Sequence, residues 1–137
     1  MDWILPRLAL GNLDDAQAYL ANEPSSRHCF MNVCQLSYEA PGYGLVWHPI
    51  ADEVCHPPPV WRALVQDLWL SLQAYETVLV HCRLGKSRSP ALVAAYLTAC
   101  GQSVNLEWAL TYVTQQHGDT EIHPETWRGA VQWWEGR

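Results

Sequence analysis

The stretch from Thr77 to Leu97, TVLVHCRLGKSRSPALVAAYL, joins two apolar runs through a short polar loop. The run TVLV is rich in β-branched residues, which favours a buried strand, and PALVAAYL is typical of a buried helix with proline in its first turn. The residues from Cys82 to Arg88 must then turn around the amino-terminal end of that helix. Successive backbone N–H groups point towards one position there, as in sites that bind tetrahedral anions. The stretch therefore predicts a phosphate-binding loop between a strand and a helix.

Short apolar segments alternate with helical patterns along the rest of the chain. Strands are predicted at 7–11, 29–35, 44–50 and 77–82, because each segment is apolar and bounded by glycine, proline or polar residues. Helices are predicted at 13–20, 60–75, 91–100, 104–116 and 124–134. Ser103 is the expected cap of the fourth of these helices. This order predicts an α/β fold, with a central sheet of four to five mostly parallel strands flanked by helices.

Length and composition fit one domain over residues 1–137, because a chain with 49% hydrophobic residues can build a single core. The net charge of -6 argues against partners such as nucleic acid or an anionic membrane, since both need a broad basic surface. The sequence has neither an apolar window long enough to span a membrane nor a secretory signal pattern. We expect a soluble, cytoplasmic monomer.

The cysteines and tryptophans are both numerous for a chain of this length. The five cysteines lack the CxxC spacing of a zinc site or of a disulfide framework, so neither a metal nor another cofactor is expected. We interpret all of them except Cys82 as unreactive free thiols. Most of the eight tryptophans fall on predicted apolar faces and are expected to pack in the core. Trp133 and Trp134 cannot both face inward on a helix, so one of them is a candidate partner contact.

The chemistry of the loop centres on Cys82. A thiol at a helix amino terminus, close to Arg88, is expected to ionise readily and to be a thiolate at neutral pH. Such a thiolate can attack the phosphorus of a bound monoester in line and form a cysteinyl-phosphate. Arg88 offers two parallel N–H donors to phosphate oxygens, and Ser89 is expected to stabilise the sulfur as leaving group. Gly85 is expected to allow a tight turn and to keep a Cβ away from the anion.

The nine residues from His81 to Ser89 resemble the signature HCxxGxxR, followed by Ser or Thr, of the cysteine-dependent protein tyrosine phosphatases. Their GxSRS form resembles that of the dual-specificity branch. Looser similarity extends over ILPRLALGNLDDAQ, MNV, EWALTYV and IHPETW. The resemblance implies a phosphorylated protein or peptide as substrate, with phosphotyrosine and, in a shallower pocket, phosphoserine or phosphothreonine as target. It also implies that phosphate binds to Arg83, Leu84, Gly85, Lys86, Ser87 and Arg88.

The family supplies the proton for the leaving group from an aspartate on a mobile upstream loop, and HPIADEVCHPPP occupies that place. The resemblance makes Asp52 the candidate acid, with Glu53 as the neighbouring alternative and a merely solvated acid pair as a third. Asp67 is expected to be solvated on the polar face of the 60–75 helix. In such relatives the Asn of the NV strand steadies the phosphate loop, which implies this role for Asn32. His81 is expected to order the loop by bonding to backbone carbonyls.

Two departures from the family pattern and several alternatives remain. The segment QQHGDTEI lacks the arginine that relatives tend to carry there, and the chain lacks the amino-terminal tyrosine clamp of the tyrosine-specific enzymes. Lys86 and Arg83 would favour a second phosphate on the substrate, unless Arg83 points outward into solvent. The open alternatives are a phosphatase of inositol phosphates, phosphoinositides or RNA 5' ends, and a phosphate-reading module without turnover. Sulfur transfer and arsenate reduction also use a cysteine in an anion loop.

Overall fold

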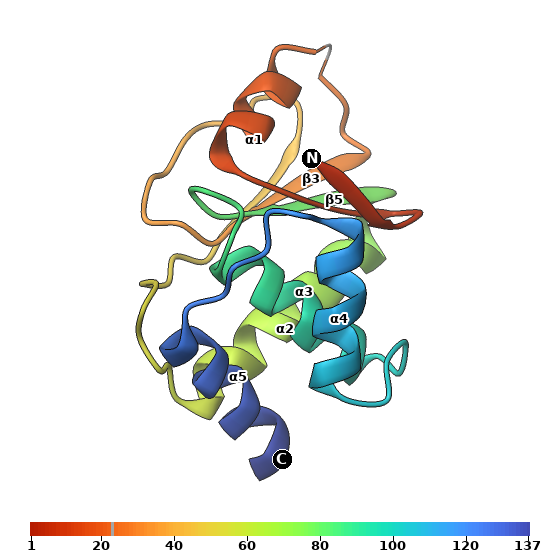
Figure 1. Cartoon of the computed structure of the whole chain (residues 1–137). Helices are drawn as coiled ribbons and strands as arrows, with labels where there is room; N and C mark the ends of the chain where they lie inside the picture. The colour runs from red at the N-terminus through yellow and green to blue at the C-terminus, as the bar shows by residue number, and fades with distance from the viewer. Residues whose placement is uncertain (23) are drawn as a thin grey trace.

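Five strands form one mixed sheet in the computed structural model, which describes residues 1–22 and 24–137 (Figure 1). The strands are β1 (Asp2–Leu5), β2 (Leu8–Gly11), β3 (His28–Asn32), β4 (Gly44–Trp47) and β5 (Thr77–His81). Their order is β1-β2-β5-β3-β4, with β1 antiparallel to β2 and all other neighbours parallel. The predicted α/β fold with a mostly parallel sheet is therefore confirmed. β1 was not predicted, because Ile4 is its single buried residue and no apolar alternation results.

Helices cover both faces of the sheet (Figure 1). They are α1 (Leu13–Leu20), α2 (Pro58–Ala74), α3 (Arg88–Ala99), α4 (Leu106–Gln116) and α5 (Pro124–Gly136). α1 packs on one face over a small cluster that contains Phe30 and Leu79, whereas α2 to α5 build the larger core on the other face. Each predicted helix is present among the described residues; α1 has the predicted bounds, and the other helices differ from the prediction at one or both ends. No helix in this part of the chain is long and apolar enough to cross a lipid bilayer.

The helices α2, α3 and α4 begin at other residues than the sequence predicted. α4 is capped by Asn105, whose side chain accepts a hydrogen bond from the backbone N of Trp108 at 2.9 Å, so the predicted Ser103 cap is wrong. The Ser103 hydroxyl instead donates to the carbonyl of Asn105 at 2.8 Å. α3 begins earlier than predicted, which places Arg88 and Ser89 in its first turn. Helical backbone therefore holds these two side chains at the edge of the phosphate-binding loop.

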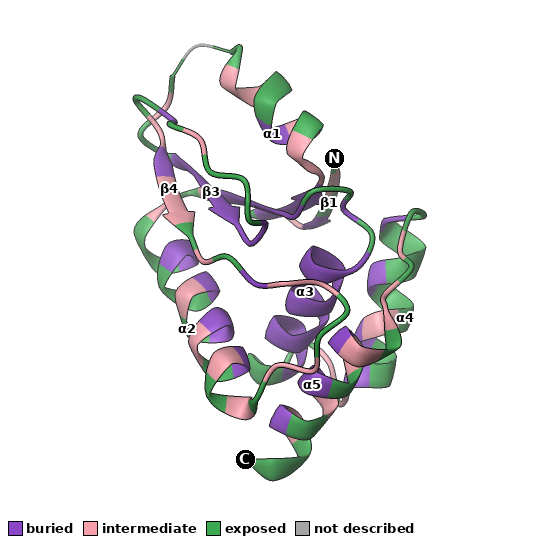
Figure 2. Cartoon of the chain, turned by 90° about the vertical axis from the view of Figure 1, so that its left-hand side faces the viewer, coloured by how far each residue is buried: buried purple, intermediate pink, exposed green. Residues whose placement is uncertain are grey.

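α3 is the buried centre of the helical layer (Figure 2). Every residue from Arg88 to Thr98 is buried, and α2, α4 and α5 pack against it. Its alanines allow close approach of the neighbouring helices, and burial of a large apolar side chain such as Leu92 contributes about 2 kcal/mol. The loop before α3 is thus anchored between this helix and β5, the central strand of the sheet.

Half of the eight tryptophan rings are exposed, whereas the sequence placed most of them in the core. Trp47 and Trp69 are 48% exposed, and Trp108 is 64% exposed. Trp47 ends the edge strand β4, which has a neighbouring strand on one side only. Residue type alone does not determine which strand end or helix face another element will cover. Of the neighbours Trp133 and Trp134, the first is buried and the second is partly exposed, in agreement with the prediction that only one faces inward.

Candidate active site

The loop between β5 and α3 lies at the carboxyl end of the parallel strands, beside the end of β2. Gly85 has a φ of 71°, in the left-handed region that favours glycine. A Cβ on this residue would lie 2.8 Å from the carbonyl oxygen of Gly11, at the end of β2. The predicted tight turn at Gly85 is therefore confirmed, and a side chain here would collide with the adjacent strand rather than with the anion. The backbone N of Leu13 also donates to the carbonyl of Arg83 at 3.1 Å and ties the loop to α1.

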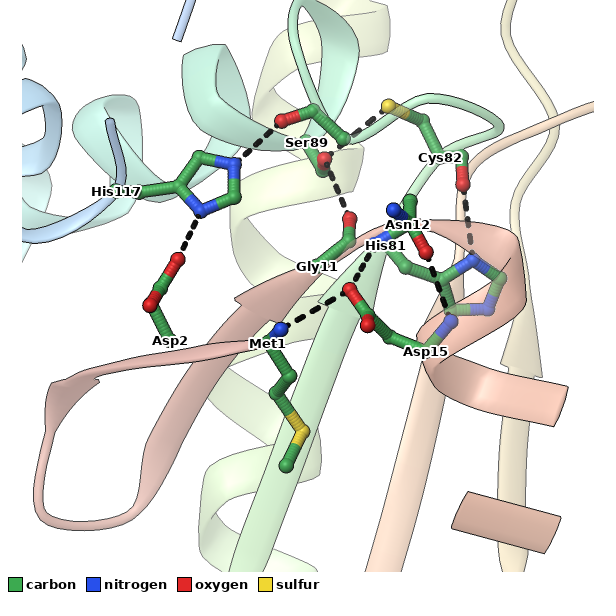
Figure 3. Close-up of polar contacts among 10 residues, drawn as sticks. Met1, Asp2, Gly11, Asn12, Asp15, His81, Cys82, Ser89 and His117 are labelled. Atoms are coloured by element: carbon green, nitrogen blue, oxygen red, sulfur yellow. Dashed lines mark hydrogen bonds and ion pairs between the residues drawn. The ribbon is translucent and has the colours of Figure 1, made fainter. Parts of the chain in front are cut away.

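Cys82 is the first residue of the loop and is only 2% exposed. Its Sγ lies 3.1 Å from the hydroxyl oxygen of Ser89, which also lies 3.4 Å from the carbonyl of Gly11 (Figure 3). The hydroxyl proton of Ser89 can therefore be donated either to the sulfur or to the carbonyl. A thiolate is the stronger acceptor, because a hydrogen bond to an ionised group is roughly twice as strong as a neutral one. The structure thus brings together the cysteine and the serine that the sequence predicted.

Arg88 is 9% exposed and is held in place through one of its terminal nitrogens. Nη1 donates to the side-chain oxygen of Gln35 and to the carbonyl of Ile50, each at 3.0 Å. Nε is buried and has no hydrogen-bond partner among the described residues. A buried donor without an acceptor is costly, and a tetrahedral oxyanion that accepts two parallel bonds would satisfy it. Gln35 was missed from the sequence, because a glutamine in a loop has no pattern that links it to a distant arginine.

A cavity of about 320 Å³ opens over these groups. Its lining residues are Asp52, Glu53, Cys82, Leu84, Lys86, Ser87, Arg88, Glu121, Ile122, His123 and Pro124. The Arg83 side chain is exposed and Arg83 does not line the cavity, in line with the outward-pointing alternative. Larger hollows of about 460 and 450 Å³ lie around Trp108 and Trp69, away from the cysteine. Chemistry rather than size therefore identifies the candidate site.

Asp52, the candidate acid, lies in this cavity and accepts hydrogen bonds from two hydroxyl groups. Ser87 and Thr126 each donate to its Oδ1 at 2.7 Å. The Ser87 oxygen itself accepts from the backbone N of His123 at 3.0 Å, and the Thr126 oxygen accepts from the backbone N of Glu53 at 3.1 Å. These backbone donors leave the two hydroxyl protons directed at Asp52. Glu53 also lines the cavity, so the alternative acid is close as well.

The surroundings of Asp52 favour its ionised form. Burial tends to raise its pKa, but the hydrogen bonds from Thr126 and Ser87, the backbone N–H of Glu53 and the charge of Arg88 together lower it. Thr126 was missed from the sequence because it lies on α5, far from the acid loop along the chain. An acid whose pKa is lowered in this way keeps its proton only at more acidic pH than an ordinary aspartate does.

His81 precedes the cysteine and is fully buried. Burial lowers its pKa to about 4, so the ring is neutral at physiological pH. Nδ1 lies 3.2 Å from the carbonyl of Cys82, which accepts only, and Nε2 lies 2.6 Å from the hydroxyl of Tyr38. The neutral ring therefore donates from Nδ1 to the loop and accepts at Nε2 from Tyr38. Bonding to a backbone carbonyl was the role expected from the sequence.

The side chain of Asn32 is hydrogen-bonded to the turn after β3, so the role in steadying the phosphate-binding loop that the resemblance implied stays a prediction. Its Oδ1 accepts from the backbone N of Cys34 at 2.9 Å, and its Nδ2 donates to the carbonyl of Leu36 at 2.8 Å. These bonds order the turn after β3. Gln35 lies in that turn and accepts the hydrogen bond from Arg88, so Asn32 acts on the site through this turn.

The segment that links α4 to α5 supports the loop from outside, which the sequence did not indicate. His117 Nε2 lies 2.6 Å from the carbonyl oxygen of Gly85, and the backbone N of Glu121 donates to the carbonyl of Lys86 at 2.8 Å. This is the segment that lacks the family's arginine.

Among the described residues no group of three or more His, Cys, Asp or Glu side chains is placed to hold a metal ion, and all five cysteines are free thiols.

A buried cysteine, an arginine in the first turn of the next helix and a loop at the carboxyl end of a parallel sheet define a cysteine-dependent phosphatase. Residues 62–134 match the family described as dual specificity phosphatase, catalytic domain. The match extends over more than half of the chain, and the chain belongs to this family.

Solved structures of such phosphatases have the same fold as this chain. Human DUSP28 is 23% identical with a TM-score of 0.80, and the alignment covers 99% of this chain and 96% of DUSP28. A mouse putative dual specificity phosphatase complexed with zinc tungstate is 19% identical with a TM-score of 0.78, over 98% and 86% of the two chains. The OH1 tyrosine phosphatase of Orf virus is 20% identical with a TM-score of 0.76, over 96% and 84%.

Proposed function

We propose that this protein phosphatase removes phosphate from phosphotyrosine, phosphoserine and phosphothreonine in proteins through a phosphoryl group carried on Cys82. Family membership establishes the enzyme class, and the roles of individual residues are the proposal. The observation that carries it is the convergence of three groups on one cavity: the Cys82 sulfur, the Arg88 guanidinium with its unpartnered Nε, and the Asp52 carboxyl group.

In the first step the substrate's phosphate oxygens accept hydrogen bonds from the loop N–H groups and from Arg88. The Cys82 thiolate attacks phosphorus, an S–P bond forms and the P–O bond to the leaving group breaks. The leaving oxygen takes both electrons of that bond and is protonated by Asp52. Nearby Arg88 reduces the charge on the transferred group throughout this step.

In the second step water attacks phosphorus and the S–P bond breaks. Asp52, now ionised, accepts the proton from water, and its two hydroxyl partners stabilise this ionised form. The sulfur leaves as a thiolate that accepts a hydrogen bond from Ser89, at the 3.1 Å separation of the two atoms. Inorganic phosphate is released and the starting state is restored.

The rim of the cavity supports a side chain on a protein as the leaving group. Ile122 and Pro124 are apolar, while Glu53 and Glu121 are acidic. Apolar rim residues suit the ring of phosphotyrosine or the short chain of phosphothreonine. The two carboxylates disfavour a leaving group with several further phosphates, because like charges repel.

A panel of substrates tests this proposal. Phosphopeptides with tyrosine, serine or threonine should be hydrolysed in the presence of a chelator, whereas inositol phosphates and RNA with a 5' phosphate should be poor substrates. Cys82→Ser should keep phosphopeptide affinity and lose essentially all turnover, because a hydroxyl is not ionised at neutral pH. Turnover by this variant, or a strict need for added metal, would exclude the covalent mechanism. Preference for RNA or inositol phosphates would move the substrate class to those alternatives.

A further inference from the structure

His117 lies directly behind the phosphate-binding loop, where α4 ends. It is 5% exposed, and its ring bridges two parts of the chain that are distant in sequence (Figure 3). Nε2 lies 2.6 Å from the carbonyl oxygen of Gly85 in the loop, and Nδ1 lies 2.6 Å from Oδ2 of Asp2 on β1. Nothing in the catalytic steps above uses either His117 or Asp2.

The two partners of this ring determine where its hydrogens are. A backbone carbonyl accepts hydrogen bonds and cannot donate, and the ionised carboxylate of half-exposed Asp2 also accepts only. Two hydrogen bonds donated by His117 to these two acceptors require a hydrogen on each ring nitrogen, which is the imidazolium form of the ring. His81 differs, because the hydroxyl of Tyr38 supplies the hydrogen for one of its nitrogens.

The carbonyl of Gly85 is held on the side of the loop away from the anion. A trans peptide unit is planar, and its C=O and the next N–H point in opposite directions. A bond from His117 to this carbonyl therefore fixes the direction of the N–H of Lys86, a residue that lines the cavity. The backbone N of Glu121 holds the following carbonyl, that of Lys86, in the same way at 2.8 Å. Two successive peptide units of the loop are thus held from behind by one segment.

We infer that the Asp2–His117 pair is a positioning device whose proton controls how tightly the loop binds an oxyanion. This rests on the proposed function of the loop. The imidazolium aligns the Gly85–Lys86 peptide and places a positive charge behind the loop, and Asp2 accepts the second ring N–H.

A neutral ring cannot make both contacts, since it has one N–H for two acceptors. If the hydrogen stays on Nε2, the lone pair of Nδ1 faces the carboxylate of Asp2, and if it stays on Nδ1, the carbonyl of Gly85 loses its donor. Rising pH should therefore loosen the loop. The charged groups next to these contacts along the chain are Asp2 itself, the amino terminus at Met1, Lys86 in the loop, and Asp119 and Glu121 after α4.

Tungstate binding to the Cys82→Ser protein tests the pair without interference from thiolate titration. The dissociation constant, measured by calorimetry between about pH 6 and about pH 9, spans the range in which a histidine loses its proton. Affinity should fall roughly tenfold or more over this range, the worth of one charge-assisted hydrogen bond. His117→Gln, added to this background, should bind weakly at both ends of the range.

Asp2→Asn is the decisive variant, because an amide can donate to Nδ1 of a neutral ring while Nε2–H keeps its bond to Gly85. It should retain tungstate binding and lose the pH dependence, and the ring ¹⁵N signals of His117 should change from those of an imidazolium to those of a neutral ring. Half-exposed Asp2 tolerates this change even if His117→Gln fails to fold.

His48→Gln is the matched control, because His48 pairs with Asp67 at 2.7 Å in the same way but away from the loop. It should leave the pH dependence intact. If Asp2→Asn binds tungstate with an unchanged pH dependence, the inference about the Asp2–His117 pair is wrong, while the proposed function of the loop still stands. Absence of tungstate binding in Cys82→Ser at any pH would overturn the proposed loop function, and this inference with it.

Discussion

In the proposed mechanism, Asp52 is the residue whose surroundings matter most for the rate of the first step. Its carboxyl group accepts two hydroxyl hydrogen bonds, and these bonds contribute to a lowered pKa. A general acid must be protonated when the leaving group departs, so the lowered pKa moves the active range towards acidic pH. The same bonds keep Asp52 ionised for the second step, in which it is proposed to act as a base, but they also lower its basicity. The hydrogen bonds to Asp52 therefore affect both its strength as an acid in the first step and its strength as a base in the second.

Thr126→Val should raise the pKa of Asp52, because one of the hydrogen bonds to the ionised form is lost. The basic limb of the pH profile of kcat/KM for a tyrosyl phosphate should then move to higher pH. Thr111→Val is the control, since Thr111 is an exposed threonine on α4 that bonds only to its own helix. A basic limb that stays in place in Thr126→Val would mean that Asp52 is not the group titrating there.

Asp52→Asn should lower kcat for a tyrosyl phosphate by roughly 10²- to 10⁴-fold, the usual worth of general acid catalysis. The loss should shrink with a strongly electron-withdrawing aryl phosphate, whose leaving oxygen needs a proton less. Glu53→Gln is the control and should be close to neutral. If Glu53→Gln shows the large, leaving-group-dependent loss instead, the acid is Glu53.

At the scale of elements, α5 reaches the site because it packs closely against α2. Gly129 lies at their contact, where an added Cβ would be 2.6 Å from Nε1 of Trp61 and 2.9 Å from the carbonyl of His56. Both neighbours are too close for a side chain, and one of them is backbone. This contact positions Thr126, one turn earlier on α5, beside Asp52.

Gly129→Ala should lower the free energy of unfolding by about 1–3 kcal/mol, the usual cost of overpacking, as measured by urea denaturation. It should also reduce kcat, because a shift of α5 moves Thr126 away from the acid. Gly136→Ala on the same helix is the control, since a Cβ there meets nothing within 4 Å. Equal stability of the two variants would show that α2 and α5 pack less closely than described.

At the scale of the whole molecule, buried histidines make stability depend on pH. Burial lowers the pKa of His28 and of His81 to about 4, from 6.5 for an exposed ring. Between these values the unfolded chain binds more protons than the folded one, so folding stability rises with pH in that range. The contribution of the two neutral histidines to folding stability is complete above about pH 6.5 and is lost as the pH falls towards 4. The pKa of Asp52 is also lowered, so its contribution to folding stability is likewise lost as the pH falls.

Each of the two histidines should cost up to about 3 kcal/mol of stability on acidification. Urea denaturation at a series of pH values between 4 and 6.5 measures the slope, and His28→Phe should make it shallower by removing one titrating ring. Stability that is flat over this interval would contradict neutral, buried rings. If the slope is found, the acidic range that favours Asp52 as an acid is also the range in which the fold weakens.

The sequence by itself determined the α/β class and the central strand, loop and helix with Cys82, Arg88 and Ser89. It could do so because these groups lie within one short segment, and because the loop binds its anion mainly through backbone N–H groups that any such turn presents. The tight turn at Gly85 was predictable from the same segment, whereas its close approach to the carbonyl of Gly11 depends on the packing of β2. Helix ends and the burial of tryptophans were predicted less well, since caps and exposed faces depend on neighbouring elements.

Only the tertiary structure decided which distant side chains complete the site. Four such residues come from four separate parts of the chain. Gln35 accepts a hydrogen bond from Arg88, Thr126 donates to Asp52, and His117 contacts both Gly85 and Asp2. None of these residues belongs to a local pattern, because a hydrogen bond between remote segments depends on strand order and helix packing rather than on spacing along the chain. Strand order brings β1 and β2 to one side of β5, and the packing of α4 and α5 against α3 brings their side chains to the loop.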